Sequence, residues 1–544
     1  MQKVLTAAQM REVDRLTTER YGIPSIILME NAAHATARVI TEKLGGSVKG
    51  KSILILCGKG NNGGDGAALA RILHMNGAVV IVDVFGSLSD AASDAKTNFE
   101  ILSGLARATA RGFFREQDIQ DVDAFDDWLA ATNFDFADVV VDALFGTGLN
   151  RELDGFLGNL TGWMGNWRRG NEKPYIVSID LPSGLSSDTG QVLGANVHAH
   201  TTITFTTPKI GNVVAPASSF NGELIIADIG SPQVLIDEQV SQLYVATRAD
   251  VSTWFNNSEF LDSSFKNKRG HALVIAGSSN YSGAAVLAGN AAMRSGVGLV
   301  TLACPTNAKT EIASRLLPEV ILTTIELPDF DEHVSKADAV AVGCGLDANN
   351  AEVETLVRKI IETRTRPIIV DAGALWFYSP AEDSLQKPAR SKGTDQPDST
   401  ARNPLILTPH EGEFLRLLGT DDKAAIKDRV AAVRDFATKQ NVILVLKGER
   451  VLIGAPDGRV VVNPTGNSGL GKAGNGDTLT GILAGFVSQA AKMNIDFFET
   501  VVAAVYIAGM AGDIAEKKFG KRVMTASDVR ECLVEVFDSL EVAD

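Results

Sequence analysis

The sequence predicts an α/β protein of two domains, each built on a parallel, doubly wound sheet. Short apolar runs alternate with segments of helical periodicity in both halves of the chain. Such runs are typical of strands buried on both faces of a parallel sheet. A chain of 544 residues is also too long for one hydrophobic core. The alternation breaks near 230–264, where Asp, Asn and Ser become frequent. We therefore expect one domain over 1–236 and a second over 237–544.

The first half begins with helices and continues as strands that alternate with helices. The spacing of Met10, Val13 and Leu16 predicts one helix, and a second is expected to begin near Ile26, after Pro24. The glycine-rich stretch GKGNNGGDG at 58–66 is expected to be a loop that leads into a helix. The expected strands are 52–57, 79–85, 139–143, 175–180, 201–207 and 224–229.

The second half shows the same alternation without repeating a motif of the first. A helix of small residues is expected over 284–294, and the polar stretch 379–403 is expected to be an exposed loop. The expected strands are 271–276, 299–303, 339–342, 367–370, 405–407 and 442–446, followed by a hairpin-like pair at 450–454 and 460–462.

Composition and charge restrict the class of function. Hydrophobic residues make up 45% and charged residues 22%, as in a soluble globular protein. The net charge of −15 argues against binding to nucleic acids or anionic membranes. No apolar run reaches the ~18 residues of a membrane span, so the apolar stretch 501–512 is expected to be a buried helix. The N-terminus lacks a signal-peptide core. The four cysteines form no Cys-x-x-Cys pair, which indicates neither zinc nor disulfides and fits a cytoplasmic protein.

Polar residues follow three predicted strands of the first half, at the edge where a parallel sheet binds ligands. A single Asp at such a position more often caps a helix, but three loops on one edge favour a site. Their oxygens suit a small cation, and the glycines at 63–64 and 146–148 suit a phosphate. Lys209 is either a surface lysine or a partner of Asp180. The residues expected to converge are Asn62, Asp142, Asp180 and Ser183.

Three segments, GKGNNGGDGAALAR, VDALFGTGLNRE and SIDLPSGL, follow the upstream segment IPSIILMENAA. Together they resemble the NAD(P)H-hydrate epimerase family over about 5–232. The resemblance implies a Rossmann-like parallel-sheet sandwich, a potassium ion held by Asn62, Asp142 and Ser183, and Asp180 with Lys209 as candidate acid–base pair. The implied hydrate contacts are Asn61, Asn62, Gly63, Gly64, Asp65, Gly146, Thr147, Gly148, Leu149, Asn150, Arg151, Glu152 and Asp180.

In the second half, the glycine-rich stretch Gly466–Gly481 carries one carboxylate, Asp477, ahead of an apolar run that can form a helix. A helix N-terminus favours anions, although a flexible loop with a capping aspartate would show the same pattern. This stretch joins GSSNYSGAAVLA, VGCGLD, VDAGAL, TPHEGEF and VLKGERV in a resemblance to the ADP/ATP-dependent NAD(P)H-hydrate dehydratase over about 245–540.

That resemblance implies a ribokinase-like α/β/α domain in which Asp477 is the catalytic base and Gly476 contacts the nucleotide phosphate. The implied adenylate-binding segment is Lys447, Gly448, Glu449, Arg450 and Val451. The implied hydrate contacts are Ala284, Gly345, His410 and Asp477.

Together the two resemblances imply a bifunctional metabolite-repair enzyme, an isomerase joined to a lyase. The first half would equilibrate the R and S hydrates of NADH and NADPH. The second would phosphorylate the ring hydroxyl of the S form and eliminate phosphate, with Mg²⁺ and with ADP, or ATP, as co-substrate. A homo-oligomer is also expected. Two alternatives stay open. One is a ribokinase-type small-molecule kinase with a regulatory nucleotide-binding domain, and the other is a first half that only binds.

Overall fold

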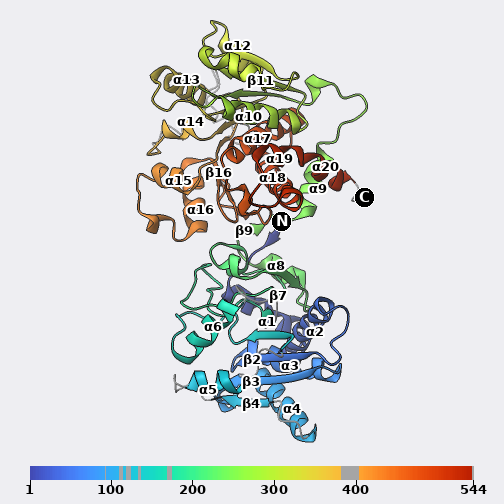
Figure 1. The fold of residues 1–544 in the computed structure, drawn as a ribbon. Helices are drawn as coiled ribbons and strands as arrows, with labels where there is room; N and C mark the ends of the chain where they lie inside the picture. Colours follow the sequence, from blue (N-terminus) through green and yellow to red (C-terminus); the bar gives the residue numbers. More distant parts are fainter. Residues whose placement is uncertain are drawn as a thin grey trace. The chain divides into compact units, whose positions relative to one another are not determined.

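The computed structural model describes residues 1–91, 93–109, 114–117, 124–132, 137–167, 174–381 and 403–541. The chain divides into two compact units, one formed by Lys3–Ser241 and the other by Met1–Gln2 together with Gln242–Asp544 (Figure 1). Both units are α/β, which confirms the predicted fold class. Most of the polar stretch 379–403, predicted to be an exposed loop, lies outside the described residues.

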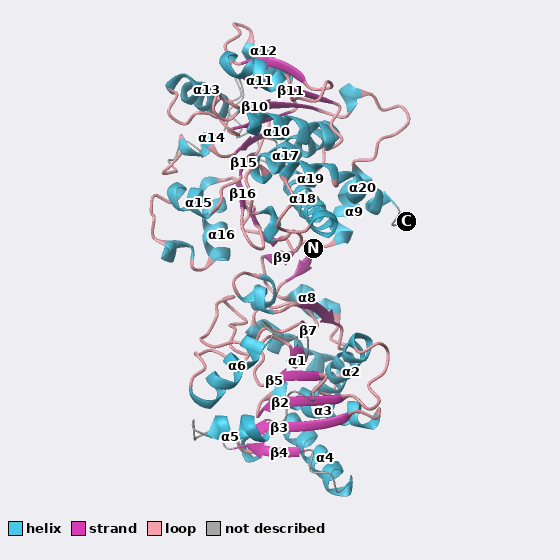
Figure 2. Cartoon of the chain, in the orientation of Figure 1, coloured by secondary structure: helices cyan, strands magenta, loops and turns pink. Residues whose placement is uncertain are grey.

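The first unit contains a sheet whose seven described strands are all parallel to their neighbours (Figure 2). The strand order is β4-β3-β2-β5-β6-β7-β8. The six predicted strands begin and end within two residues of their predicted bounds. The strands are β2 (Ser52–Gly58), β3 (Val79–Phe85), β4 (Phe114–Gln117), β5 (Val139–Ala143), β6 (Tyr175–Ile179), β7 (Thr201–Phe205) and β8 (Glu223–Ala227).

Helices cover both faces of this sheet because side chains alternate along each strand. Ile53 and Ile55 of β2 share a core with α2, α3 and α4, whereas Leu54 and Leu56 share another with α5 and α6. The helices of the unit are α1 (Ala7–Tyr21), α2 (Ser25–Lys43), α3 (Asn61–Met75), α4 (Ser93–Thr109), α5 (Ala124–Ala131), α6 (Gly155–Trp167), α7 (Ile210–Val213) and α8 (Gln233–Glu238).

Helix α3 begins at Asn61, so the prediction that 58–66 is entirely a loop was wrong for its second part. The glycines have a packing role there. A Cβ on Gly63 would lie 1.7 Å from the carbonyl oxygen of Gly58, and one on Gly64 would lie 2.7 Å from Cα of Ala95. A Cβ on Gly66 would lie 2.7 Å from Cβ of Ala143. The helix therefore approaches the sheet and α4 more closely than side chains would permit.

The second unit contains a sheet with eleven strands in the described part of the chain, in the order β1-β9-β18-β17-β16-β15-β14-β13-β10-β11-β12. The run from β16 to β12 is parallel, and β17 is antiparallel to both neighbours, which confirms the predicted hairpin. The strands are β1 (Gln2–Lys3), β9 (Leu243–Val245), β10 (His271–Ile275), β11 (Leu299–Cys304), β12 (Ile321–Thr324), β13 (Ala339–Val342), β14 (Ile368–Val370), β15 (Leu405–Leu407), β16 (Ile443–Leu446), β17 (Leu452–Gly454) and β18 (Val460–Val462).

Two helices, α10 (Ser282–Arg294) and α17 (Asn475–Met493), pack closely against each other in the core of the second unit (Figure 1). A Cβ on Gly481 would lie 2.1 Å from the carbonyl oxygen of Ala288, so the small residues of both helices allow this approach. The other helices are α9 (Arg248–Asn257), α11 (Lys309–Ala313), α12 (Phe330–Lys336), α13 (Ala351–Glu362), α14 (Gly373–Trp376), α15 (Glu411–Leu417), α16 (Arg429–Gln440), α18 (Phe497–Phe519), α19 (Ala526–Glu531) and α20 (Leu533–Glu541).

Helix α18 contains the stretch 501–512 and is long and apolar enough to cross a membrane by length and composition alone. Its most apolar window is 61% buried within the unit. Val501, Ala504 and Ile507 are part of the same core as α10 and α17. The helix is therefore a core helix, as predicted.

Candidate active sites

An ion pair between Asp180 and Lys209 lies at the carboxyl edge of the first sheet. Asp180 directly follows β6, and Lys209 follows β7 at the start of α7. The Lys209 Nζ lies 2.8 Å from Asp180 Oδ1, and the two side chains are almost fully buried. Lys209 Nζ also donates hydrogen bonds to Thr204 Oγ1 at 2.9 Å and to the carbonyl oxygen of Phe205 at 3.0 Å. All three hydrogens of this ammonium group therefore have partners.

The loop after β5 brings two further predicted residues to this ion pair. The amide of Thr147 donates to Asp180 Oδ2 at 3.2 Å. A Cβ on Gly146 would lie 2.8 Å from Asp180 Oδ2 and 3.4 Å from Asn62 Oδ1. Asn62 is buried in the first turn of α3, and neither its Oδ1 nor its Nδ2 has a hydrogen-bond partner among the described residues. Because an unsatisfied buried amide costs about 1–3 kcal/mol, this side chain indicates a place for a ligand.

Asp142 lies on the other side of the same loop and is fully buried. Its Oδ1 accepts from Ser183 Oγ at 2.6 Å, and its Oδ2 accepts from Ser183 N at 2.8 Å and from Ser178 Oγ at 2.9 Å. Burial raises the pKa of Asp142, while the hydrogen bonds from Ser183 oppose the rise. No cationic side chain in the described residues forms an ion pair with it. A buried carboxylate without an ion-pair partner in the described residues, bordered by the hydroxyl groups of Ser178 and Ser183, fits a monovalent cation.

Two more carboxylates belong to this site. Burial raises the pKa of Asp14, on α1, to about 6, while the charge of Lys209 lowers it and that of Asp180 raises it. Burial, and then the charge of Asp180, also raise the pKa of Asp65 well above its ordinary value. Asp14 Oδ1 is buried without a hydrogen-bond partner in the described part of the chain. The first site thus holds one ion-paired carboxylate, Asp180, beside three carboxyl groups whose pKa is raised by burial: Asp14, Asp65 and Asp142.

The remaining predicted hydrate contacts lie at the start of α3 and in the loop after β5. Leu149 is buried, and the others are exposed. These exposed residues are Asn61, Gly148, Asn150, Arg151 and Glu152.

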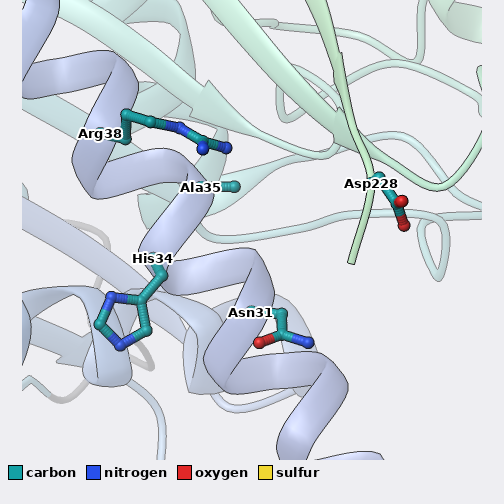
Figure 3. Close-up of a pocket in the computed structure, with 5 residues that line it drawn as sticks. All are labelled: Asn31, His34, Ala35, Arg38 and Asp228. Carbon is teal, nitrogen blue, oxygen red and sulfur yellow. The ribbon is translucent and has the colours of Figure 1, made fainter. Parts of the chain in front are cut away.

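A surface hollow of about 440 Å³ in the first unit is lined by four residues of α2 and by the residue after β8 (Figure 3). None was predicted to have a role. The lining residues are Asn31, His34, Ala35, Arg38 and Asp228.

In the second unit, a buried hydrogen-bond network connects three strand ends to α17. Asp371 follows β14 and is 2% exposed. Its Oδ1 lies 2.7 Å from Lys447 Nζ, which follows β16, and its Oδ2 accepts from Thr480 Oγ1 on α17 at 2.8 Å. Cys344, after β13, donates from Sγ to the same Oδ2 at 3.8 Å. The charge and hydrogen bond of Lys447, with that of Thr480, outweigh burial and lower the pKa of Asp371.

Asp477 lies in the first turn of α17, three residues after the N-cap Gly474. This placement confirms that the glycine-rich stretch leads into a helix N-terminus. Burial raises the pKa of Asp477, and the charge of Asp371 raises it further, whereas Cys344 and Lys447 lower it. Asp477 has no ion-pair partner in the part of the chain that is described. It is thus a stronger base than an exposed carboxylate.

His410 caps α15, where its Nδ1 accepts from the backbone amides of Gly412 at 3.1 Å and Glu413 at 3.3 Å. In the neutral ring this leaves the proton on Nε2, which lies 3.5 Å from Glu413 Oε1. Glu413 Oε2 in turn lies 3.9 Å from Lys447 Nζ. Two other predicted hydrate contacts also meet, because a Cβ on Gly345 would lie 2.8 Å from Cβ of Ala284.

The predicted adenylate-binding segment is a tight turn after β16. The amide of Lys447 donates to the carbonyl oxygen of Pro409 at 2.8 Å, which ties the segment to His410. Gly448 has a φ of 147° and Arg450 a φ of 51°. Arg429 Nη1 donates to the carbonyl oxygen of Glu449 at 3.1 Å, so a cation lies beside this turn. Val451 follows, half-buried, and Gly476 lies in the first turn of α17.

Backbone strain concentrates at these two sites. Among the described non-glycine residues with positive φ, Asn441 and Asn494 end helices, where this conformation is common. The other four are Asp180, Thr206, Ala372 and Arg450. Each is in, or next to, one of the networks above. Such conformations cost about 1–3 kcal/mol each and persist where the surroundings fix them, often at functional sites.

The sequence did not point to Asp14, Asp371, Glu413 or Thr480. Asp371 lay within a quoted motif and directly follows a strand, which is the same signal that selected Asp180. Asp14 and Thr480 gave no such signal, because each lies inside a helix and is recognised only by what it contacts.

Comparison with known proteins places both units in one family. The family model described as NAD(P)H-hydrate dehydratase matches residues 272–534, and the model described as YjeF-related protein N-terminus matches 25–211. The bifunctional NAD(P)H-hydrate repair enzyme of Moorella thermoacetica is 37% identical, over 99% of this chain and 97% of its own length. The enzyme of the same name from Thermofilum pendens is 33% identical, over 96% of this chain and 94% of its own.

A solved structure is also similar to part of this chain. It is the ADP/ATP-dependent NAD(P)H-hydrate dehydratase of Bacillus subtilis, co-crystallised with ATP and Mg²⁺. It is 29% identical, with a TM-score of 0.46, and covers 55% of this chain and 100% of its own. The two family models and the full-length relatives agree with the two constellations built above. The chain belongs to the family of bifunctional NAD(P)H-hydrate repair enzymes.

Proposed function

We propose that the first unit interconverts the R and S hydrates of NADH and NADPH, and that the second dehydrates the S form at the expense of a nucleotide. The observation that carries this proposal is the presence of two separate lysine–aspartate networks at the carboxyl edges of two sheets. One includes the orphaned amide of Asn62, and the other borders a helix N-terminus whose carboxylate, Asp477, has no ion-pair partner among the described residues. Each suits one step of the repair.

Epimerisation must invert the ring carbon that bears the hydroxyl and adjoins the ring nitrogen. The hydroxyl takes up a proton and leaves as water, and a water then adds to the other face and loses a proton. Asp180 moves one of these protons in the proposed mechanism. Lys209 has no free hydrogen, so it holds Asp180 in place and balances its charge. Asn62 and Thr147 would hold the ring and its amide group beside this carboxylate.

Potassium is proposed to bind Asp142 and Asn62, each of which lies against the loop after β5. Asp142 and Ser183 would hold the ion with the unsatisfied Oδ1 of Asn62. When bound, the ion supplies positive charge for the buried Asp142 and fixes the loop that carries Gly146 and Thr147. This loop contacts Asp180 directly, so its order determines the shape of the site.

Dehydration requires a better leaving group than hydroxide. Asp477 takes the proton of the ring hydroxyl, and the hydroxyl oxygen forms a bond to the terminal phosphorus of ADP while AMP leaves. The C–O bond then breaks with its electron pair on phosphate, pushed by the ring nitrogen, and loss of a proton from the next carbon restores the double bond. The products are NAD(P)H, AMP and phosphate. The amides at the start of α17 stabilise the transferring phosphoryl group.

Mg²⁺ would neutralise the nucleotide phosphates when it arrives with them. Asp477 lacks a cation of its own among the described side chains, which fits a site completed by a bound metal. ADP is proposed as the preferred co-substrate, with ATP as the other candidate. A cytoplasmic location is proposed because the four cysteines are buried free thiols. A homo-oligomer stays a prediction.

The proposal is tested with purified protein, separated R and S hydrates, Mg²⁺, K⁺ and ADP or ATP. The S form should regain reduced-nicotinamide absorbance in step with release of AMP, or ADP if ATP is used, and phosphate. The R form should do so only after epimerisation. The alternative of a small-molecule kinase predicts a stable phosphorylated product instead. No recovery of absorbance with either nucleotide would reject the proposal.

A further inference from the structure

We infer that Asp371 is a positioning residue of the dehydratase site, which fixes Lys447 to the helix that carries the base, so that its ammonium group binds the phosphoryl group in transfer. This inference rests on the dehydration reaction proposed above. It changes the role that the resemblance implies for Lys447, which was contact with the adenylate that remains behind.

The geometry connects Lys447 to α17 through two short contacts. Lys447 Nζ lies 2.7 Å from Asp371 Oδ1, and Asp371 Oδ2 accepts from Thr480 Oγ1 at 2.8 Å. Asp371 and Thr480 are 2% and 1% exposed, so water does not compete for these bonds. Thr480 lies three residues after Asp477 on the same helix and therefore shares its face. The position of the ammonium group is thus fixed relative to Asp477.

Lys447 also lies between the N-terminus of α17 and a predicted hydrate contact. Its Nζ is 3.6 Å from the place of a Cβ on Gly476, at the helix N-terminus. The charges of Lys447 and Asp371 both act on Asp477, which takes the proton of the attacking hydroxyl. On its other side, Lys447 Nζ lies 3.9 Å from Glu413, next to His410, a predicted hydrate contact. The Lys447 ammonium therefore lies between the base, Asp477, and a predicted hydrate contact. This is where the phosphoryl group passes to the ring hydroxyl.

The ammonium group of Lys447 has N–H groups available to bind the phosphoryl group. Among the described residues, Asp371 is its one partner within hydrogen-bond distance, because Glu413 is too distant, whereas the ammonium of Lys209 has three partners. The charges of Asp371 and Glu413 raise the pKa of Lys447 despite burial, so the group stays positive. Two hydrogens therefore remain for phosphoryl oxygens, which gain negative charge in the transition state.

The experiment compares three variants of the full chain. Thr480→Val keeps the shape of Thr480 and removes its hydrogen bond to Asp371, and Asp371→Asn removes the charge that holds Lys447. Ser488→Ala is the matched control, because it removes another buried hydroxyl bond of α17, to the carbonyl oxygen of Ala484, two turns away. Dehydration of the S hydrate gives kcat and KM for ADP, and titration calorimetry gives the Kd of AMP, which lacks the transferred group.

The expected result is a loss in kcat without a loss in AMP binding. Thr480→Val should lower kcat about 10-fold and Asp371→Asn about 100-fold or more, since a misplacement of about 1 Å can cost that much. The Kd of AMP should stay within about twofold, and Ser488→Ala should keep kcat. Epimerisation of the R hydrate, measured in the same samples, should not change.

Two results would overturn the inference. One is a kcat within about twofold of wild type in Thr480→Val. This variant alone is a sufficient test if Asp371→Asn does not fold. The other is a loss of AMP binding that matches the loss of kcat, because Lys447 would then contact the phosphate that stays on the adenylate. If the wild-type chain does not dehydrate the S hydrate at all, the proposed function fails and the inference with it.

Discussion

Replacement of Lys209 by Met should destabilise the first unit, because it leaves the buried carboxylate of Asp180 without its cation. The ammonium group makes three contacts, at 2.8 Å to Asp180, 2.9 Å to Thr204 and 3.0 Å to Phe205. Breaking a buried ion pair by removing one partner typically costs about 3–5 kcal/mol. Asp180 is 9% exposed, so little water can replace the lysine. We expect the free energy of unfolding of the first unit to fall by an amount within that range.

The assay is native-state hydrogen exchange of peptides from β6 and β7, which reports opening of this unit and not of the other. The double variant Lys209→Met with Asp180→Asn is the control, because it removes the uncompensated charge as well. It should regain at least half of the lost stability. The single variant could instead lose less than about 1 kcal/mol of stability, and the double variant could lose more. That result would refute the view that Lys209 compensates the buried charge of Asp180.

Three other predictions concern the same unit. Asp142→Asn should abolish any stimulation of epimerisation by K⁺ over Na⁺, and stimulation equal to that of wild type would reject the potassium site. The native pKa of Asp14 is raised from 3.8 to about 6, so its contribution to stability is complete below about pH 3.8 and is lost as pH rises through about 6. This contribution is about 1–3 kcal/mol, and urea unfolding of Asp14→Asn should lack that part of the pH dependence. Gly66→Ala should cost about 1–3 kcal/mol by thermal unfolding, because its Cβ would lie 2.7 Å from Cβ of Ala143.

The strands could be predicted closely because a buried parallel strand is a short apolar run whatever its neighbours. The same rule selected Asp142 and Asp180, which the structure places on either side of one loop. The same pattern of short apolar runs predicted the parallel strands β10, β11 and β13 to β16 of the second sheet and the hairpin of β17 and β18. The strands β1, β4, β9 and β12 were missed, because each is short and is defined by its partner strand.

Other features depend on contacts between segments that are distant in sequence. The glycines of α3 suggested a loop, although their real constraint is the close approach of Gly58, Ala95 and Ala143. Asp14 occupies a polar position of an amphipathic helix, where a solvated side chain would give the same pattern. The role of Lys447 likewise could not be read from its motif, because it depends on Asp371 and Thr480.

We propose that one chain carries two separate chemistries for the same damaged cofactor, with Asp477 as the base of the second. The decisive experiment gives the Asp477→Asn variant a mixture of R and S hydrates, ADP, Mg²⁺ and K⁺. We expect recovery of reduced-nicotinamide absorbance to fall at least about 100-fold, since loss of a general base typically costs 10²–10⁴-fold, while exchange between the two hydrates continues at the wild-type rate. Full dehydration by this variant, or loss of both activities in a folded protein, would contradict it.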